Sequence, residues 1–205
     1  MRVSYGVVGH WKRRDKAIEI AESLNAALAM DEGDAGSLPN HDLAWRLAYD
    51  PAADWVVVLE DDVILIDNFD EHVQDALNNV PREGAVSFYT GTAKPRPNIV
   101  RKAVAQGLER GCSWLRSNDL YWGPAVALPA HRVIPMLNFV QRVDRPYDSR
   151  IGYYLRANGL PCFYSLPSLV DHIDGPSLIK GCEEPRKAHV FEEPTNWNKR
   201  YLYMK

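Results

Sequence analysis

One short segment constrains the fold more than any other: the five consecutive apolar residues 55–59, followed directly by Glu60, Asp61 and Asp62. A continuous apolar, β-branched run of this length is typical of a strand buried on both faces, as in a parallel sheet covered by helices. Ligand sites in open α/β sheets lie beyond the carboxyl ends of such strands. The segment therefore predicts a central strand that ends at an acidic binding site.

Strand and helix patterns alternate along most of the chain. They predict strands over residues 3–8, 55–59, 63–66, 85–89, 121–128 and 161–166, and helices over residues 16–28, 40–49, 70–79, 129–140 and 149–158. Residues 26–30 fit either a short strand or the end of the preceding helix. This alternation predicts an α/β domain with a mostly parallel central sheet flanked by helices.

Two stretches give weaker patterns. Prolines and glycines interrupt residues 91–118, which predicts a loop-rich excursion near the ligand. The residues beyond 175 are polar and contain several prolines, which predicts a tail over the surface. We expect one catalytic domain over residues 1–178 and a tail over residues 179–205 that packs on the domain or covers the site.

Charge and hydropathy limit the function classes. The net charge of −3 leaves no general basic field for nucleic acid, although a local basic patch remains compatible with it. No segment approaches the roughly 20 apolar residues of a membrane span, and the first residues lack a secretory pattern. We expect a cytoplasmic protein, and the three cysteines, which lack CxxC spacing, are interpreted as ordinary thiols.

Carboxylates and a histidine form the candidate metal site. Three adjacent carboxylates, Glu60, Asp61 and Asp62, repel one another, and a hard cation such as Mg²⁺ or Mn²⁺ would relieve that repulsion while sharing phosphate oxygens. Acids that only begin a turn are the simpler alternative. His172 follows a short apolar stretch, and its neutral imidazole could complete the shell of the cation. Taken alone, His172 fits a structural or surface histidine better than a metal ligand.

Two aromatic and basic segments could bind other parts of a ligand. In the loop after the first strand, His10 or Trp11 could stack on a base, and Arg13 could contact a phosphate. A solvated, basic helix start is the alternative, although basic residues there oppose the helix dipole. Later in the chain, Tyr121, Trp122 and Gly123 precede a strand and could form an acceptor platform, with core packing of the rings as the alternative.

These motifs resemble those of a known superfamily. Residues 55–65, with their strand and acidic triplet, resemble the DxD-type segment of A-type (GT-A fold) glycosyltransferases, notably the lipopolysaccharide-type family 25 enzymes. The segment Pro-Ser-Leu-Val-x-His-Ile at residues 167–173 resembles the late strand and histidine of the same superfamily. With the amino-terminal β-loop-α unit, the resemblance spans most of residues 3–177. It implies a single-domain, Rossmann-like fold that binds a nucleotide sugar.

The resemblance also implies roles for the acidic triplet. It implies that Asp62 binds the metal directly, that Glu60 or Asp61 contacts the metal or the donor ribose, and that His172 supplies a later metal ligand. This chain has Glu60 where a strict DxD motif begins with aspartate. The role of Glu60 is therefore the least constrained of the three.

Further donor and acceptor residues follow from the same resemblance. The loop with His10 and Arg13 is similar to the one that receives the base and ribose, and Asp31 and Asn40 occupy positions that hold the base or ribose and the diphosphate. Asp148 is similar to the carboxylate that removes the acceptor's proton in inverting members. Ordinary loop and capping roles are the alternatives for Asp31 and Asn40, and a helix N-cap is the alternative for Asp148.

The sequence thus predicts a divalent-metal-dependent glycosyltransferase that uses Mn²⁺ or Mg²⁺ and a nucleoside diphosphate sugar, with a UDP-sugar favoured. The acceptor, which could be a glycan, lipid, protein or modified base, stays open, as do the stereochemical outcome and the oligomeric state. The first alternative is a nucleotidyltransferase, but the first loop lacks its glycine density. The second alternative is a non-catalytic module that binds carbohydrate or nucleotide sugar. A metal-dependent nuclease is disfavoured by the negative net charge.

Overall fold

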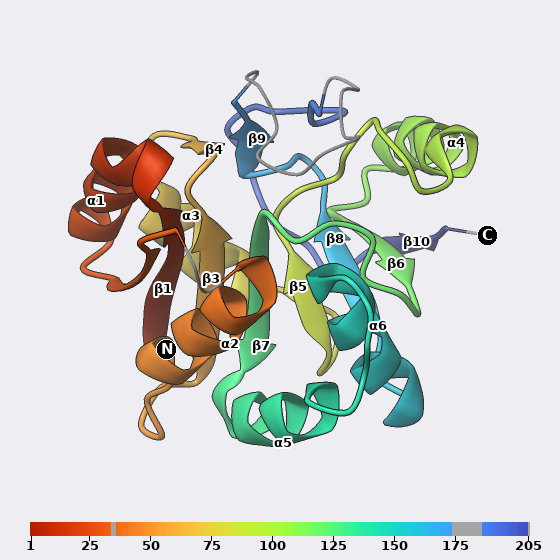
Figure 1. Cartoon of the computed structure of the whole chain (residues 1–205). Coiled ribbons are helices and arrows are strands. Elements are labelled where there is room, and N and C mark those ends of the chain that lie inside the picture. Colours follow the sequence, from red (N-terminus) through yellow and green to blue (C-terminus); the bar gives the residue numbers. More distant parts are fainter. Residues whose placement is uncertain (34–35, 174–185, 205) are drawn as a thin grey trace.

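The chain forms an α/β domain in which helices flank a large mixed sheet (Figure 1). The computed structural model describes residues 1–33, 36–173 and 186–204. The predicted boundary between residues 178 and 179 lies outside the described residues, as does Cys182. Within the described part, no helix is long and apolar enough to cross a membrane.

Strands and helices alternate through the described residues. The strands are β1 (Val3–His10), β2 (Ala27–Asp31), β3 (Trp55–Glu60), β4 (Val63–Leu65), β5 (Ala85–Ser87), β6 (Trp114–Ser117), β7 (Ala125–Pro129), β8 (Cys162–Ser165), β9 (Val170–His172) and β10 (Tyr201–Tyr203). The helices are a short 3₁₀ turn (Trp11–Arg13), α1 (Arg14–Ser23), α2 (Ser37–Ala48), α3 (Phe69–Asn78), α4 (Pro97–Glu109), α5 (Ala130–Val140) and α6 (Tyr147–Ala157).

The main sheet is mixed rather than mostly parallel. Its described strands follow the order β10-β6-β8-β5-β7-β3-β1-β2. Pairings β1–β2, β1–β3, β5–β8 and β6–β10 are parallel, whereas β3–β7, β5–β7 and β6–β8 are antiparallel. Strands β6, β7 and β10 therefore run against the others. An apolar run shows that a strand is buried but carries no information on its direction, so the sequence did not reveal this mixture.

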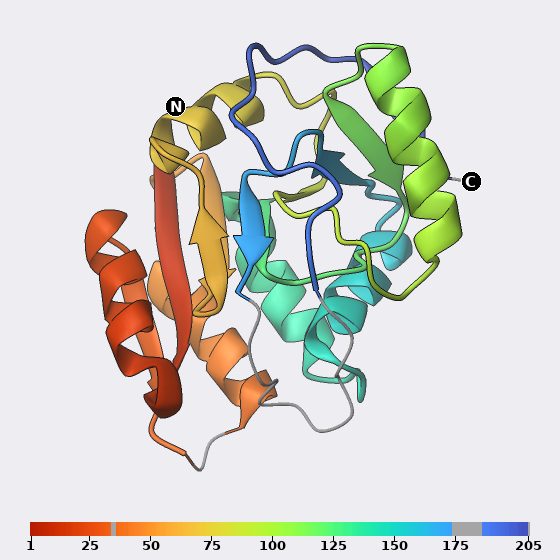
Figure 2. The ribbon, with the colours of Figure 1, turned by 90° about the horizontal axis from the view of Figure 1, so that it is seen from above.

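Helices cover both faces of the sheet around β1. A Cβ on Gly6 would lie 2.8 Å from the Cβ of Ala48 in α2, and one on Gly9 would lie 2.9 Å from the Cβ of Ala17 in α1. Because positions 6 and 9 point to opposite faces of a strand, α1 and α2 pack on opposite sides. Helices α5 and α6 lie beside α2, as Figure 2 shows. The glycines let both helices approach the strand closely.

A second, two-stranded sheet lies at the carboxyl ends of the first strands (Figure 1). It pairs β4 with β9 in antiparallel register, with Val63 opposite His172 and Leu65 opposite Val170. The predicted segment 63–66 is thus a strand, but outside the main sheet. Through this pairing a late strand of the chain reaches the residues that follow β3.

Most predicted elements are present, with shifted bounds. Residues 27–31 are a strand, so α1 ends at Ser23 and does not continue to residue 28. Helix α2 begins at Ser37, which places Asn40 within its first turn and not at its start. Residues 121–124 precede β7 and are not part of it.

The weakly patterned segments contain regular structure. Residues 91–118 include α4 and β6, so the prediction of a loop-rich excursion there was wrong, and the carboxyl-terminal segment contributes β10 to the main sheet. Pro97 is compatible with α4 because it occupies the first turn, where no intrahelical N–H bond is lost. Gly107 lies inside α4, where its missing side chain admits Leu115 and Leu166. Pro97 therefore starts the helix and Gly107 allows close packing, although both residue types usually interrupt helices.

Candidate functional site

A pocket opens where the first three parallel strands end. Strand β1 lies between β2 and β3, so the strand order reverses beside it, which is where open α/β sheets bind ligands. The pocket has a volume of about 290 Å³. Its lining residues include His10, Arg13, Asp31, Asn40, Glu60, Asp61 and Asp62, together with His41 and Arg186. The structure thus brings seven sequence-predicted residues from three strand ends into one pocket.

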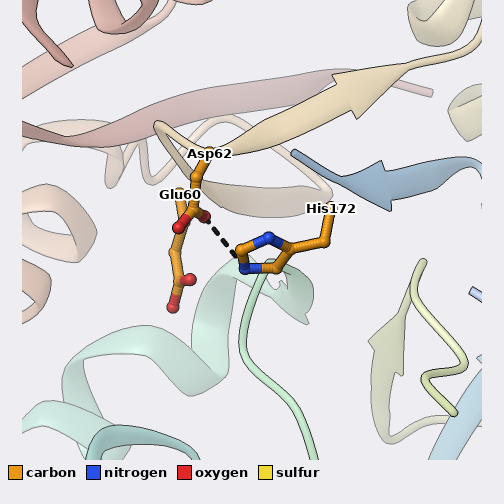
Figure 3. A group of neighbouring side chains, drawn as sticks. All are labelled: Glu60, Asp62 and His172. Atoms are coloured by element: carbon orange, nitrogen blue, oxygen red, sulfur yellow. Dashed lines mark ion pairs between the residues drawn. The ribbon is translucent and has the colours of Figure 1, made fainter. Parts of the chain in front are cut away.

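Glu60, Asp62 and His172 form a compact group beside this pocket (Figure 3). One potential ligand atom from each residue lies within 4.8 Å of the others. Glu60 ends β3, Asp62 follows it, and the β4–β9 pairing carries His172 to the same place. The Ile173 N–H donates to the Asp62 carbonyl at 2.8 Å, which fixes the two backbones together. Long-range strand pairing therefore assembles the group.

Two buried atoms in this group have no hydrogen-bond partner among the residues that the structure describes. They are Asp62 Oδ1 and His172 Nε2, which lie 3.4 Å apart (Figure 3). The other imidazole nitrogen, His172 Nδ1, lies 3.0 Å from the Ile173 carbonyl oxygen, which can only accept. The proton of a neutral imidazole is therefore on Nδ1, and a lone pair on Nε2 faces a carboxylate oxygen. Two buried acceptors that face each other are costly unless a cation or a proton lies between them.

The electrostatics of the two carboxylates differ. Burial raises the pKa of Asp62, and the negative charge of Glu60 raises it further, while His172, Arg13 and Arg186 act in the opposite direction. Burial also raises the pKa of Glu60, but the hydrogen bond from His41 and nearby positive charge outweigh it and bring that pKa below its ordinary value. Asp62 is therefore the carboxylate for which an added cation would relieve the larger cost.

A divalent cation fits this donor set. Ligand atoms that bind one ion at about 2.0–2.2 Å lie at most about 4.4 Å apart, so small side-chain rotations would bring the three residues into range. Two carboxylates favour hard cations and the imidazole favours softer ones, a combination that suits Mn²⁺ better than Mg²⁺. The fixed Nδ1–H···O=C bond orients the imidazole, as is usual for a metal-binding histidine.

Asp61 organises the first loop. Its Oδ2 accepts the backbone N–H of His10 at 2.7 Å, and its Oδ1 accepts from Arg13 Nη1 at 2.8 Å. The same Nη1 lies 3.0 Å from Asp62 Oδ2. Both oxygens of Asp61 are thus engaged, and the residue holds Arg13 across the acidic triplet. Among the three acids, Asp61 alone lies outside the candidate metal group.

His41 is a site residue that the sequence analysis missed. Its Nδ1 lies 2.7 Å from the Ser37 carbonyl oxygen, and its Nε2 lies 3.2 Å from Glu60 Oε1. The ring packs on Tyr147 with 3.8 Å between centroids, and the Tyr147 hydroxyl accepts from Trp45 Nε1 at 3.1 Å. His41 therefore orients Glu60 from inside α2. No motif marks a lone histidine inside a helix, so only the tertiary contacts reveal it.

Arg186 is a second residue without a sequence signal. It lines the pocket, and its Nη2 lies 3.7 Å from Asp62 Oδ2. Its neighbour Lys187 donates from Nζ to the His172 carbonyl at 3.0 Å. The carboxyl-terminal segment thus contributes a guanidinium to the acidic site.

Asp31 and Asn40 line the pocket while bonding to its frame. Asp31 accepts the backbone N–H groups of Gly33 at 2.8 Å and Gly36 at 3.0 Å, which shapes the loop after β2. Asn40 is buried, and its Nδ2 donates to the carbonyls of Gly9 at 2.9 Å and Ala29 at 3.2 Å. Asn40 therefore ties the ends of β1 and β2 together beneath the pocket.

Asp148 is the second residue of α6 and does not cap it. The N-cap position is Pro146, which makes no side-chain capping bond, so the alternative that Asp148 is the N-cap residue was wrong. Asp148 Oδ1 instead accepts the N–H of Ser149 at 2.6 Å. Burial raises the pKa of Asp148, and the charge of Glu60 adds to the increase. Asp148 follows Tyr147, which packs on His41, so it lies in the same neighbourhood as the acidic group.

The predicted acceptor residues lie mainly in the core. Tyr121 and Trp122 are buried, and their rings pack against each other and against Tyr164. Neither ring presents an open face, so the core-packing alternative describes both. Gly123 is different, because a Cβ there would lie 2.6 Å from the Tyr147 ring and 3.3 Å from Glu60 Oε1. Its missing side chain admits both groups to the site.

No protein-family model matches this chain, and no curated protein matches it significantly. The chemistry of the site is therefore argued from its own residues.

Proposed function

We propose that this protein is a divalent-metal-dependent glycosyltransferase that moves a sugar from a nucleoside diphosphate sugar to an acceptor hydroxyl. The observation that carries the proposal is the pair of buried atoms Asp62 Oδ1 and His172 Nε2, which have no hydrogen-bond partner in the described part of the chain and face each other beside Glu60 at the carboxyl end of β3. Their position next to a pocket at a reversal of strand order suits a nucleotide diphosphate. The resemblance of the two motifs to A-type glycosyltransferases supports the same reaction.

Some residues of the site would balance the negative charge of the donor, and others keep the pocket in shape. A bound cation would supply positive charge to the departing diphosphate. Arg13 and Arg186 line the same pocket and add positive charge that does not depend on a metal. Asp61 and Asn40 hold the ends of the strands that carry these groups, which keeps the pocket preorganised.

Asp148 is the candidate for the acceptor side. Its raised pKa makes its carboxylate a better proton acceptor than an ordinary aspartate. In an inverting reaction it would take the proton of the acceptor hydroxyl. In a retaining reaction no base is needed on that face, and Asp148→Asn would then keep most of the transfer rate.

The volume of the pocket limits how much of the donor it can hold. About 290 Å³ is near the lower end of the roughly 300–1,000 Å³ typical of small-molecule sites. This volume suits the nucleoside and its phosphates better than an entire nucleotide sugar. We therefore place the nucleoside and diphosphate in the pocket and the sugar on the side of Glu60 and Gly123.

The experiment measures release of nucleoside diphosphate from a panel of UDP- and GDP-sugars, with Mn²⁺ or with EDTA. The test variant is Asp62→Asn, and the matched control is Asp67→Asn, an exposed acid in the same segment. We expect metal-dependent release from the native protein and the control, and loss of release in Asp62→Asn. Mn²⁺ binding measured by calorimetry accompanies each assay.

The two assays together separate the alternatives. Metal and nucleotide binding without release would favour a non-catalytic binding module. Release of pyrophosphate from a nucleoside triphosphate and a sugar phosphate would favour a nucleotidyltransferase. If neither Mn²⁺ nor any donor raises the melting temperature, the proposal is overturned, because a ligand that binds the folded state must stabilise it.

A further inference from the structure

A basic and aromatic surface lies at the opposite edge of the sheet from the candidate metal site. It is formed by α4, β10 and the turn before β10 (Figure 1). Five strand-to-strand steps separate β10 from β3, which places the two sites roughly 24 Å apart at about 4.8 Å per step. We call this surface the α4–β10 groove. It consists of two adjoining hollows that share Arg110 and Tyr201, with further lining from Lys102, Gln106, Lys199, Arg200 and Tyr203.

Charge is concentrated in this part of the chain. Residues 94–116 contain six basic side chains and one acidic side chain, a net charge of +5 in a protein whose total is −3. Lys199 and Arg200 add two more cations from the carboxyl-terminal segment. The remaining surface is correspondingly acidic. The local patch that a negative net charge still allowed is therefore present, assembled from two segments distant in sequence.

The cations of the groove form no ion pair with any acidic residue that the structure describes. Among the described residues, no carboxylate forms an ion pair with Lys102, Arg110, Lys199 or Arg200, whereas some surface arginines elsewhere do pair with an acid, as Arg132 does with Glu83. Glu109 is the only acid among the described residues that line the two hollows. Unneutralised positive charge in a concave surface attracts polyanions strongly.

Exposed aromatic rings accompany the cations. Tyr201 and Tyr203 are 39% and 47% exposed, and their rings pack edge to face, 5.5 Å between centroids. The Arg116 guanidinium lies 4.4 Å from the centroid of the Tyr203 ring. Positions 201 and 203 share the face of β10 that lies beside Arg116, whereas Leu202, opposite Leu115, lies on the face that α4 covers. Both tyrosines line the same hollow as Lys102. Such rings can stack on planar groups between phosphate contacts.

The groove is held in place by the turn before β10. The Asn198 N–H donates to Ser113 Oγ at 3.0 Å, and its Nδ2 donates to the Gly111 carbonyl at 3.1 Å. The Asn198 carbonyl accepts from Trp114 Nε1 at 2.9 Å. These bonds anchor Lys199 and Arg200 against α4. A Cβ on Gly111 would lie 3.7 Å from Arg200 Nη1, so the guanidinium lies directly over the end of the helix.

We propose that the α4–β10 groove binds single-stranded nucleic acid, with its cations on the phosphates and its tyrosines on the bases. The combination of a basic groove with exposed rings matches this class of ligand. The surface is hollowed rather than protruding, which disfavours insertion into an anionic bilayer. The site needs neither metal nor nucleotide sugar, so it stands independently of the proposed transferase function.

The test measures anisotropy of fluorescein-labelled oligo-dT and oligo-U of about 16 nucleotides, without metal or donor. The charge variant is Lys102→Ala with Arg110→Ala and Arg200→Ala. The matched control is Arg46→Ala with Arg142→Ala and Arg145→Ala, which removes the same charge from exposed positions outside the groove. We expect affinity to fall about tenfold or more in the charge variant only, and its log–log salt slope to fall by about 2.

A second variant separates stacking from charge. Tyr201→Leu with Tyr203→Leu retains apolar bulk on β10 but removes the rings, and we expect at least about a fivefold loss of affinity. Circular dichroism and the melting temperature confirm folding of each variant. Comparison of oligo-dT with oligo-U distinguishes DNA from RNA as the ligand.

Several outcomes would overturn the proposal. No measurable oligonucleotide binding would do so, as would equal losses in the charge variant and its control. Equal affinity for heparin, polyglutamate or anionic vesicles would assign the groove to polyanions in general, and an unchanged affinity after removal of both tyrosines would do the same. A preference for duplex over single strands would also contradict it. None of these results bears on sugar-donor cleavage.

Discussion

The two ends of the main sheet are built by different means. At one end, β1, β2 and β3 follow one another along the chain through α1 and α2, and all three pair in parallel. At the other end, β6 pairs with β10, which lies 87 positions later. Short crossovers assemble the frame of the pocket, to which the β4–β9 pairing adds His172, whereas the groove depends on the turn at Asn198 and on β10. The two candidate sites should therefore be separable by mutation.

Two buried tryptophans offer the strongest test of this separation. Trp45 and Trp114 are both fully buried, and their indole N–H groups bond to Tyr147 and Asn198 respectively. We expect each Trp→Ala change to lower the free energy of unfolding by about 3–5 kcal/mol, measured by urea denaturation. Mn²⁺ affinity should fall only in Trp45→Ala, and oligonucleotide affinity only in Trp114→Ala.

If the alanine variants do not fold, the milder Trp→Phe changes test the same separation. Trp45→Phe should weaken only Mn²⁺ binding and Trp114→Phe only oligonucleotide binding, each by less than the corresponding alanine change. If both changes reduced both affinities equally, the two ends of the sheet would form one cooperative unit, and the separation would be wrong.

His41 gives a test confined to the pocket. Loss of an outer partner of a metal-binding residue typically costs 10- to 100-fold in metal affinity, so we expect His41→Phe to weaken Mn²⁺ binding by about that factor. His41→Gln retains an N–H donor toward Glu60 and should lose less. Isothermal titration calorimetry measures the metal affinity directly. Unchanged binding in His41→Phe would show that Glu60 needs no support from α2.

Substitution of one glycine in each region compares how well the two regions tolerate an added methyl group. Gly123→Ala would place a methyl group against the Tyr147 ring and near Glu60, and we expect a loss of about 1–3 kcal/mol in unfolding free energy. Gly107→Ala in α4 meets only the ends of Leu115 and Leu166 side chains, and gains helix propensity of about 1 kcal/mol. Gly107→Ala should therefore leave the free energy of unfolding nearly unchanged. Thermal unfolding of both variants measures the difference, and a larger loss at Gly107 would contradict the packing described for α4.

Asp148→Asn should have the smallest effect on stability, and this effect should depend on pH. Burial raises its folded-state pKa, so the protonated form favours the folded state, and a cost appears as pH rises through that folded-state pKa. Asp148→Asn should therefore be more stable than the native protein at pH 7. The difference should vanish below the unfolded-state pKa of about 3.9. Urea denaturation across this range measures it, with the exposed Asp144→Asn as the control.

The sequence predicted the pocket end of the sheet better than the groove end. The run at 55–59 is apolar throughout and ends in three acids, so both the strand and the site at its end could be located. The pairing of the Asp62 and His172 motifs came from a family resemblance, and the β4–β9 ladder now supplies its physical basis. His41 and Arg186 could not be predicted, because their roles arise from contacts between distant elements.

The groove end has no comparable local pattern. Helix α4 contains Pro97 and Gly107, which normally argue against a helix, and only the starting position of the proline and the close packing of the glycine make them compatible with it. Strand β10 has three residues, too few to show alternation. Basic residues in these two segments became a single surface only after the chain folded.

The antiparallel ladder between β4 and β9 makes the candidate metal site sensitive to chain length. His172 lies opposite Val63 and points to the acids, whereas its neighbour Asp171 accepts the Ala188 N–H at 2.7 Å and holds the carboxyl-terminal segment. A slip of one residue in a strand exchanges its faces. One residue inserted before β9 would therefore replace the histidine with Asp171, a third carboxylate, and one residue deleted would replace it with Ile173. Natural length variation just before this strand should thus be rare in any lineage that keeps the site.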